Sequence, residues 1–300
     1  MESRHLSLLR ELRDRGSVAA VAAATWRTPS AVSQQLRTAE RDLGVHLVTA
    51  DGRGLRLTDE GRLLADAALE VETALASAQA RLDEFRGDIA GEVRIAALPS
   101  ALEYLAPLLL TALRDVPVDV RLEDCDVSEE DFAGLADSHD LVIGHTMNAA
   151  VPRRRGLVVR EVVREPLDIA IPVGHRWSKR RSLRPDEAIT EPWVTTPRGY
   201  PFRTLLDRVE RLTGRSAEIV QEVRDNRVAE ALVAAGAGIA SLPRFTTRPN
   251  PAVRLLRLRD IDSARRVLVL ARRDRAERAV VRHVIQELVA IGQDLAAAND

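Results

Sequence analysis

A cluster of small polar side chains near the amino terminus has the chemistry needed to contact base edges. Hydroxyls and amides exchange hydrogen bonds with the major groove of DNA, and arginine contacts guanine or phosphate. At helical spacing these side chains share the face opposite Val32 and Leu36. No acidic residue occurs from Gly16 to Ala39, so the segment is cationic although the chain as a whole has a net charge of −1. The cluster consists of Thr28, Ser30, Ser33, Gln34 and Arg37. An ordinary solvated helix face is the alternative.

A glycine-rich hairpin further along offers a second contact with nucleic acid. The run 51–54 places Arg53 between two glycines, and pairs of apolar residues flank the run on both sides. This pattern predicts a β-hairpin whose tip can approach a DNA backbone or insert an arginine into a minor groove. A solvated turn is the alternative.

Several polar residues follow expected strands or begin expected helices in the last two thirds of the chain. In two-lobed α/β domains such positions line the cleft that holds a ligand. Hydroxyls, helix N–H groups and an arginine would suit a carboxylate. Helix caps and loop residues are the alternative. The candidates are Ser100, Thr146, Thr196, Arg198 and Asn226.

Other reactive residue types show no recognisable arrangement. The six histidines lack the spacing of metal ligands, and the single cysteine, Cys125, excludes an intramolecular disulfide or a multi-cysteine metal site. No serine–histidine–acid set or phosphate-binding loop is present. We therefore expect no metal, no cofactor and no enzymatic activity.

The elements that must position the first cluster are short helices. An apolar stripe at Leu6, Leu9 and Leu12 predicts a first helix that ends at Gly16. A second helix, 18–24, follows an N-cap serine, and a third opens at Thr28 and Pro29. Two helices joined by a short turn form a helix-turn-helix.

A longer helix begins at the capping sequence 58–60. Its apolar residues recur at alternating steps of four and three, which is the heptad pattern of a helix that pairs with another helix. An amphipathic helix packed on its own domain is the alternative. The predicted dimerisation residues are Leu64, Ala68, Val71, Leu75, Ala78, Leu82 and Phe85.

From residue 91 onward, predicted strands alternate with helices. This order indicates parallel sheets with helical crossovers, and about 210 residues suit two lobes better than one. Apolar residues make up 45% of the 300-residue chain and aromatic residues 3%, so the cores must be aliphatic. No apolar run approaches the length of about 20 residues that spans a bilayer, and no secretory signal is visible, so we expect a cytoplasmic protein without a membrane partner.

The motifs in this order resemble those of LysR-type transcriptional regulators. The resembling segments are 17–23, Thr28 to Leu36, Glu40, Leu43-Gly44, Leu57 to Gly61, Ile171 to His175 and Leu232 to Pro243. They cover nearly the whole chain. Two positions depart from the family pattern: Thr25 replaces the usual leucine, a gap that Trp26 is expected to fill, and the segment 47–50 lacks the usual arginine.

The resemblance implies three parts. The first is a winged helix-turn-helix at 1–58, mainly helical, which would contact DNA. The second is a dimerising linker helix at 59–90, and the third is a two-lobed effector-binding domain, like periplasmic binding proteins, at 91–300. Its first lobe would contain 91–162 and 265–300, and its second lobe 163–264. The expected DNA-contacting residues are Thr28, Pro29, Ser30, Ser33, Gln34, Arg37 and Arg53.

The function implied is sequence-specific control of transcription at a dyad-related double-stranded DNA site. A homodimer, raised to a homotetramer by effector-domain contacts, would respond to a small-molecule effector and act on RNA polymerase. Three alternatives stay open from the sequence: a solute-binding protein, a regulator with a vestigial cleft, and an enzyme built on the α/β lobes.

Overall fold

The computed structural model describes residues 2–51, 54–87, 89–148 and 156–299. The chain divides into two compact units, one of residues 1–88 with 272–279 and one of residues 89–271 with 280–300. Each unit has hydrophobic clusters of its own. The described helices include none that is long and apolar enough to cross a membrane.

The first unit begins with the three predicted helices, α1, α2 and α3. The Ser17 side chain caps α2, and the Thr28 hydroxyl caps α3 by accepting a hydrogen bond from the Ala31 N–H. Gly44 ends α3 at a φ of 70°, a left-handed conformation that glycine adopts without steric cost. The bounds are Ser3–Arg15 for α1, Val18–Ala24 for α2 and Pro29–Leu43 for α3.

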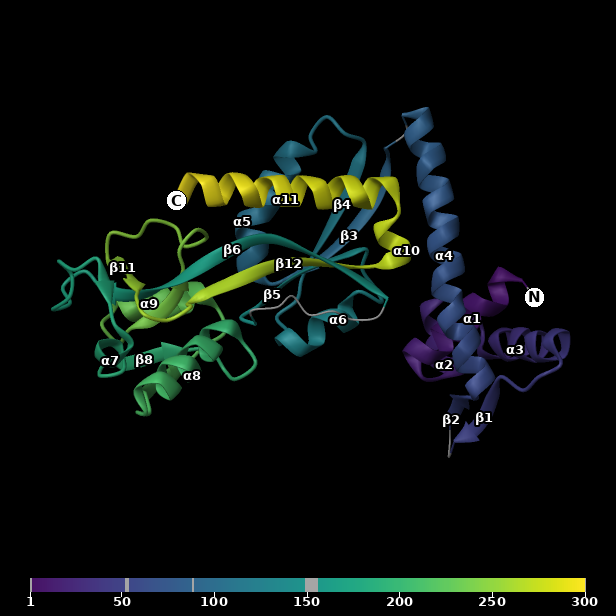
Figure 1. Ribbon diagram of the computed structural model, residues 1–300, viewed down its shortest axis with the longest axis horizontal. Coiled ribbons are helices and arrows are strands. Elements are labelled where there is room, and N and C mark those ends of the chain that lie inside the picture. The colour runs from purple at the N-terminus through teal and green to yellow at the C-terminus, as the bar shows by residue number, and fades with distance from the viewer. Residues whose placement is uncertain (1, 52–53, 88, 149–155, 300) are drawn as a thin grey trace. The chain divides into compact units, whose positions relative to one another are not determined.

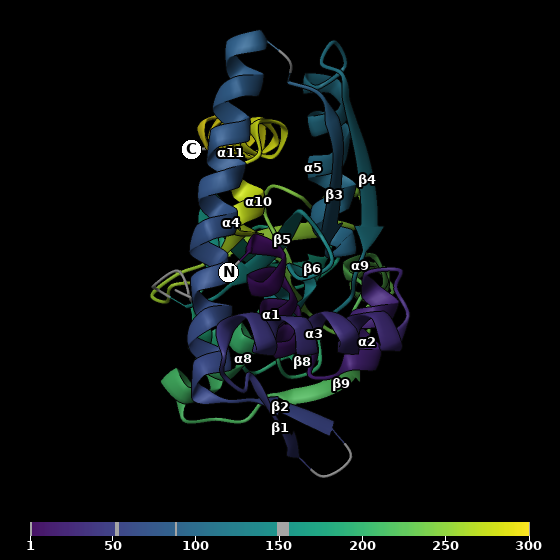
Figure 2. The same ribbon diagram turned by 90° about the vertical axis from the view of Figure 1, so that its right-hand side faces the viewer.

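A hairpin and a long helix complete this part of the unit (Figures 1 and 2). Strand β1 (Val48–Asp51) pairs antiparallel with β2 (Gly54–Leu57), as predicted. Helix α4 (Asp59–Arg86) follows directly and runs without interruption. A Cβ on Gly61, in the first turn of α4, would lie 2.2 Å from the Leu47 carbonyl oxygen, so only glycine fits this close approach.

Polar contacts also fasten α4 to α1. The Ser7 hydroxyl donates a hydrogen bond to the Glu72 carboxylate at 2.6 Å, and the Arg10 guanidinium lies 2.9 Å from the same group. The amino-terminal half of α4 is therefore part of the core of this unit. The short helix α10 (Arg273–Ala276) belongs to the same unit.

The second unit is built on an eight-stranded sheet with the order β4-β3-β5-β12-β6-β11-β7, to which β10 is added beside β6. Strands β8 and β9 form a separate parallel pair. The bounds are β3 Gly91–Ala97, β4 Val118–Asp124, β5 Leu141–Thr146, β6 Leu157–Pro172, β7 Ser182–Leu183, β8 Pro192–Thr195, β9 Glu218–Glu222, β10 Ala240–Pro243, β11 Val253–Leu258 and β12 Ala264–Arg272.

The expectation of purely parallel sheets is wrong. Parallel pairing joins β3 with β4 and β5, but β12 runs antiparallel to β5, and β10 and β11 run antiparallel to β6. The long strands β6 and β12 pass from one lobe into the other, so one sheet serves both (Figure 1). Strand β6 begins at Leu157 rather than near Leu167, because charged residues in its first half hide the strand pattern.

Helices cover the sheet in both lobes. The bounds are α5 Pro99–Ala112, η1 Glu129–Asp131, α6 Phe132–Leu135, α7 Pro185–Ala188, α8 Pro201–Thr213, α9 Asn226–Ala234 and α11 Ala279–Asn299. Helix α11 lies directly on β6, since a Cβ on Gly292 would lie 1.9 Å from the Val162 carbonyl oxygen. The core of the second lobe is mainly aliphatic and includes the fully buried Trp193.

Candidate functional site

Helix α3 turns one face inward and leaves the other exposed. Val32, Leu36 and Ala39 are buried in the core of the first unit, which fixes the rotation of the helix. Thr28, Pro29, Ser30, Gln34 and Arg37 are exposed and Ser33 is half-buried. We call these six residues the recognition face.

Three of the polar side chains of the recognition face make no hydrogen bond or ion pair within the described part of the chain. Thr28 and Ser30 share a 2.9 Å hydrogen bond at the helix start. Ser33, Gln34 and Arg37 have no hydrogen-bond or ion-pair partner in the described part of the chain. These three side chains are therefore available to an outside partner. Arg53, the predicted tip residue, lies outside the described residues.

The turn before α3 contains Trp26, whose position differs from the one expected from the sequence. Trp26 has a φ of 56° and is 96% exposed, so the expectation that it would fill the gap left by Thr25 is wrong. Thr25 instead donates its hydroxyl to the Val21 carbonyl and needs no packing substitute. An exposed tryptophan with a positive φ is costly by itself, which makes Trp26 a candidate contact residue.

The apolar stripe of α4 changes character along the helix. Ala68 is fully buried and Leu64 packs against the core of its own unit. From Val71 onward the stripe faces solvent. Leu75 is 58% and Phe85 89% exposed. The exposed members are Val71, Leu75, Ala78, Leu82 and Phe85, and we call them the α4 stripe.

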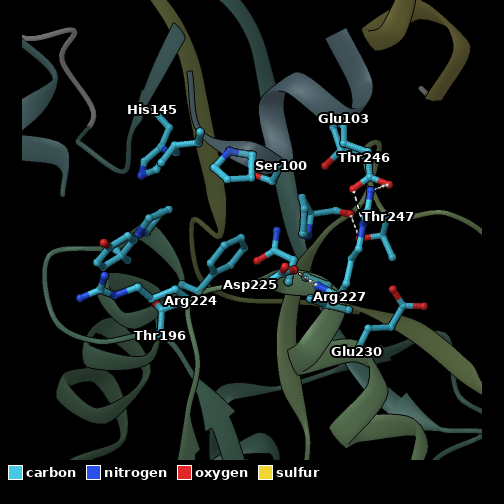
Figure 3. Close-up of a pocket in the computed structure, with 18 of the residues that line it drawn as sticks. Ser100, Glu103, His145, Thr196, Arg224, Asp225, Arg227, Glu230, Thr246 and Thr247 are labelled. Atoms are coloured by element: carbon cyan, nitrogen blue, oxygen red, sulfur yellow. Dashed lines mark hydrogen bonds and ion pairs between the residues drawn. The ribbon is translucent and has the colours of Figure 1, made fainter. Parts of the chain in front are cut away.

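The second unit contains a cavity of about 530 Å³ (Figure 3). Its walls come from the starts of α5, α8 and α9, from the ends of β5 and β10, and from the loop after β10. Of the predicted ligand residues, Ser100, Thr196 and Asn226 line it. The Thr196 hydroxyl accepts a hydrogen bond from the Arg203 N–H at 3.2 Å. The cavity lies within reach of three helix starts, a setting that favours anionic groups.

Two predicted ligand residues are not part of the cavity lining. The Thr146 hydroxyl donates to the Glu129 carboxylate and also accepts the Asn148 N–H, so it serves a loop. Arg198 is exposed. The structure thus brings together three of the five predicted residues.

Each arginine of the lining faces a carboxylate of the same chain. Arg227 is bound by Glu103 through two contacts of 2.7 and 2.9 Å, and Arg248 lies 3.4 Å from the same Glu103. These lining residues escaped the sequence analysis. A usable signal was present, because Glu103 lies one helical turn after Ser100 and Arg227 directly follows Asn226. The other two pairs are Arg224 with Asp126 at 3.6 Å and Arg265 with Glu165 at 2.7 Å.

The cavity lining includes a buried imidazole that has no hydrogen-bond partner among the described residues. His145 is 3% exposed, and neither ring nitrogen finds a partner in the described structure. Burial, with a smaller contribution from the positive charge of Arg265, holds the pKa of His145 well below its usual value of 6.5. The ring is therefore neutral at physiological pH and offers one donor and one acceptor.

The two remaining candidates, the Cys125 thiol and a metal site, lack favourable surroundings in the described part of the chain. Burial, followed by the negative charges of Glu123 and Asp124, raises the pKa of the Cys125 thiol and disfavours the thiolate. Among the described residues, no group of histidine, cysteine, aspartate and glutamate could hold a metal ion.

Comparison with known families decides the identity. Residues 3–62 match the bacterial regulatory helix-turn-helix model of the lysR family, and residues 86–292 match the LysR substrate binding domain. The chain belongs to the LysR family of transcriptional regulators. The first match contains the recognition face, and the second contains the entire cavity lining.

Individual relatives agree along most of the regulator. It is 27% identical over 278 residues to the transcriptional regulator CbbR of Xanthobacter flavus, covering 91% of this chain and 82% of that one. A full-length OxyR variant from Pseudomonas aeruginosa has the same fold, with a TM-score of 0.66 at 18% identity over 97% of this chain and 94% of that chain. Full-length CbnR in complex with its target DNA gives a TM-score of 0.55 at 22% identity over 96% and 98%.

The regulator is therefore a LysR-type DNA-binding protein with a two-lobed effector-binding domain. Members of this family bind DNA and act as oligomers. The winged helix-turn-helix and two-lobed fold expected from the sequence are confirmed.

Proposed function

We propose that the recognition face of α3 reads the operator bases. The observation that supports this most strongly is that Ser33, Gln34 and Arg37 are accessible and have no hydrogen-bond or ion-pair partner among the described residues, while the opposite side of α3 is buried. Arginine can bind guanine through two hydrogen bonds, and glutamine can bind adenine in the same way. Arg53, which lies between β1 and β2 in the sequence, and Trp26 in the turn before α3 contact the DNA backbone beside these bases.

The test is a gel-shift titration of the full chain against the DNA that flanks its own gene. We expect a discrete complex at low salt. Failure to shift any such fragment would contradict operator binding by this face.

We propose further that the α4 stripe pairs two subunits. Apolar residues at heptad spacing are left exposed from Val71 to Phe85, whereas Leu64 and Ala68 serve the core of their own unit. A dimer places two recognition faces on a dyad-related site, and contacts between effector domains raise the dimer to a tetramer.

The test of the stripe is the double variant Leu75→Glu and Leu82→Glu in the full chain, measured by sedimentation velocity. Two buried charges per subunit should shift the species from dimer or tetramer to monomer at micromolar concentration. Leu212→Glu is the matched control, because Leu212 and Leu75 are both 58% exposed. A double variant that sediments like the control would contradict pairing through α4.

A small-molecule effector in the cavity of the second unit controls the regulator in this proposal. Ser100, Thr196 and Asn226 contact the ligand, whose binding changes the relation of the two lobes and thereby the placement of the DNA-binding dimers. The effector acts only to the extent that it binds the two arrangements unequally. The regulator acts in the cytoplasm on DNA and RNA polymerase, divides into parts at 1–58, 59–90 and 91–300, and catalyses no reaction.

A further inference from the structure

The cavity is bridged on one side by a glutamate that holds two arginines. Glu103 comes from α5 in the first lobe, whereas Arg227 comes from α9 and Arg248 from the loop after β10, both in the second lobe. The side chains of Arg227 and Arg248 are 68% and 76% exposed, while that of Glu103 is 21% exposed. Figure 3 shows Glu103, Arg227 and the threonines of this loop on the same side of the cavity.

The geometry of this cluster is that of a bound carboxylate. Both oxygens of Glu103 face the guanidinium of Arg227, at 2.9 Å to Nε and 2.7 Å to a terminal nitrogen. Two parallel contacts of this kind are the strongest arrangement between arginine and a carboxylate. The hydrogen bond and the charge of Glu103 also raise the pKa of Arg227.

The space beside this cluster is suited to the rest of a ligand. Ser100, one turn before Glu103 on α5, lines the cavity, and α5 begins without a side-chain cap. The buried His145 in the cavity lining offers a donor and an acceptor that nothing in the described chain uses. Unsatisfied buried polar groups are rare in folded proteins, so this ring points to a polar group of a ligand.

We propose that Glu103 is a built-in competitor of the effector: the effector carries a carboxylate that takes Arg227 and Arg248 from Glu103, with a polar group against His145. This inference rests on the proposed effector control of the cavity. It keeps the carboxylate expected from the sequence and adds the arginines that anchor it and the glutamate that it displaces. The exchange replaces one carboxylate partner of the arginines with another, so both guanidinium groups stay paired. It also releases the bridge between the lobes, because Glu103 and the two arginines belong to different lobes.

The experiment compares the wild-type full chain with Glu103→Gln by calorimetric titration with sodium glutarate at constant ionic strength. Glutarate ends in the same carboxylate as a glutamate side chain. Without its competitor, the variant should bind glutarate at least tenfold more tightly than the wild type. Adding Arg227→Gln to the variant should abolish that gain.

Two controls separate this exchange from a general change of charge. Glu161 on β6 pairs with Arg266 on β12, and neither residue is part of the cavity lining. Glu161→Gln should therefore leave glutarate binding unchanged. Inorganic phosphate in place of glutarate tests a tetrahedral anion. The increase in affinity from the wild type to Glu103→Gln should be smaller for phosphate than for glutarate.

Three outcomes would overturn the inference: equal glutarate affinity in the wild type and Glu103→Gln, no binding by either protein, or an equal gain in Glu161→Gln. Failure here is distinguishable from failure of the proposed function. If the chain shifts operator DNA but Glu103→Gln gains no affinity for glutarate, only the competition is wrong.

Discussion

The recognition face of α3 and the cavity of the effector domain treat their polar groups in opposite ways. On α3, Ser33, Gln34 and Arg37 are left without partners in the described chain. In the cavity, every arginine of the lining already faces a carboxylate. One surface is open to its partner, and the other is occupied by its own side chains.

This difference follows from what each surface binds. The exposed polar groups of the recognition face are hydrated in the free protein, so leaving them without partners costs little free energy. On DNA, which is a polyanion, the same groups gain hydrogen bonds and ionic contacts. In the cavity lining, Arg265 is buried, and an unpaired guanidinium at that position would be costly. A ligand there must exchange with internal partners, which makes the affinity of the cavity adjustable through those partners.

The largest expected effect comes from removing the open arginine. Arg37→Ala should weaken binding to the DNA fragment by about 1–3 kcal/mol if Arg37 reads a guanine. Fluorescence anisotropy with a labelled fragment measures the change. Arg215→Ala, an exposed arginine of the effector domain, is the control and should leave affinity unchanged. Equal DNA affinity of Arg37→Ala and the wild type would contradict the proposal that Arg37 contacts DNA.

The second effect concerns His145, the one imidazole in the cavity lining. Because burial lowers its pKa, the unfolded chain binds a proton at this position below pH 6.5 while the folded chain does not. The free energy of unfolding should therefore be lower at pH 5.5 than at pH 6.5, by at most about 1 kcal/mol. In His145→Gln this contribution should disappear.

Denaturant titrations of the effector-domain transition at both pH values measure this difference. His46→Gln, at an exposed histidine of the first unit, is the control and should keep the wild-type pH dependence. A pH dependence that persists unchanged in His145→Gln would show that the ring is not held neutral.

The smallest effect is expected at Trp26, an exposed residue that we propose contacts the DNA backbone. Asparagine accepts a positive φ more readily than tryptophan, so Trp26→Asn should raise the free energy of unfolding by about 0.5–1 kcal/mol. The same change should lower DNA affinity a few-fold, because the contact with the backbone is lost. A variant that gains stability and keeps full DNA affinity would contradict a contact between Trp26 and DNA.

The elements of the first unit were predictable from sequence because their signals are local. Ser17, Thr28 and Thr58 cap the helices that they were expected to cap, and Gly16 and Gly44 end theirs. Sheet pairing in the second unit was not predictable, since strand direction depends on contacts between distant residues. Charged residues in the first half of β6 pair with a neighbouring strand, for example Glu161 with Arg266 on β12, and they interrupt the apolar pattern of a buried strand.

The candidate sites show the same division. The inward stripe of α3 fixes its outward face, so the recognition face follows from helical periodicity alone. The cavity depends on where three helix starts and one loop meet. Glu103 and Arg248 are far apart in the chain, and only folding shows that they share one ion-pair cluster.

The close packing of Gly61 against Leu47 couples the hairpin rigidly to the start of α4. Since the hairpin and the first turn of α4 touch without room for a side chain, they must move as one body. A straight helix of 28 residues is about 42 Å long. Pivoting it by about 5° at its far end would carry the hairpin roughly 4 Å, which is close to the rise of one base pair, about 3.4 Å. A small angular displacement along α4 is therefore enough to shift the hairpin from one nucleotide to the next.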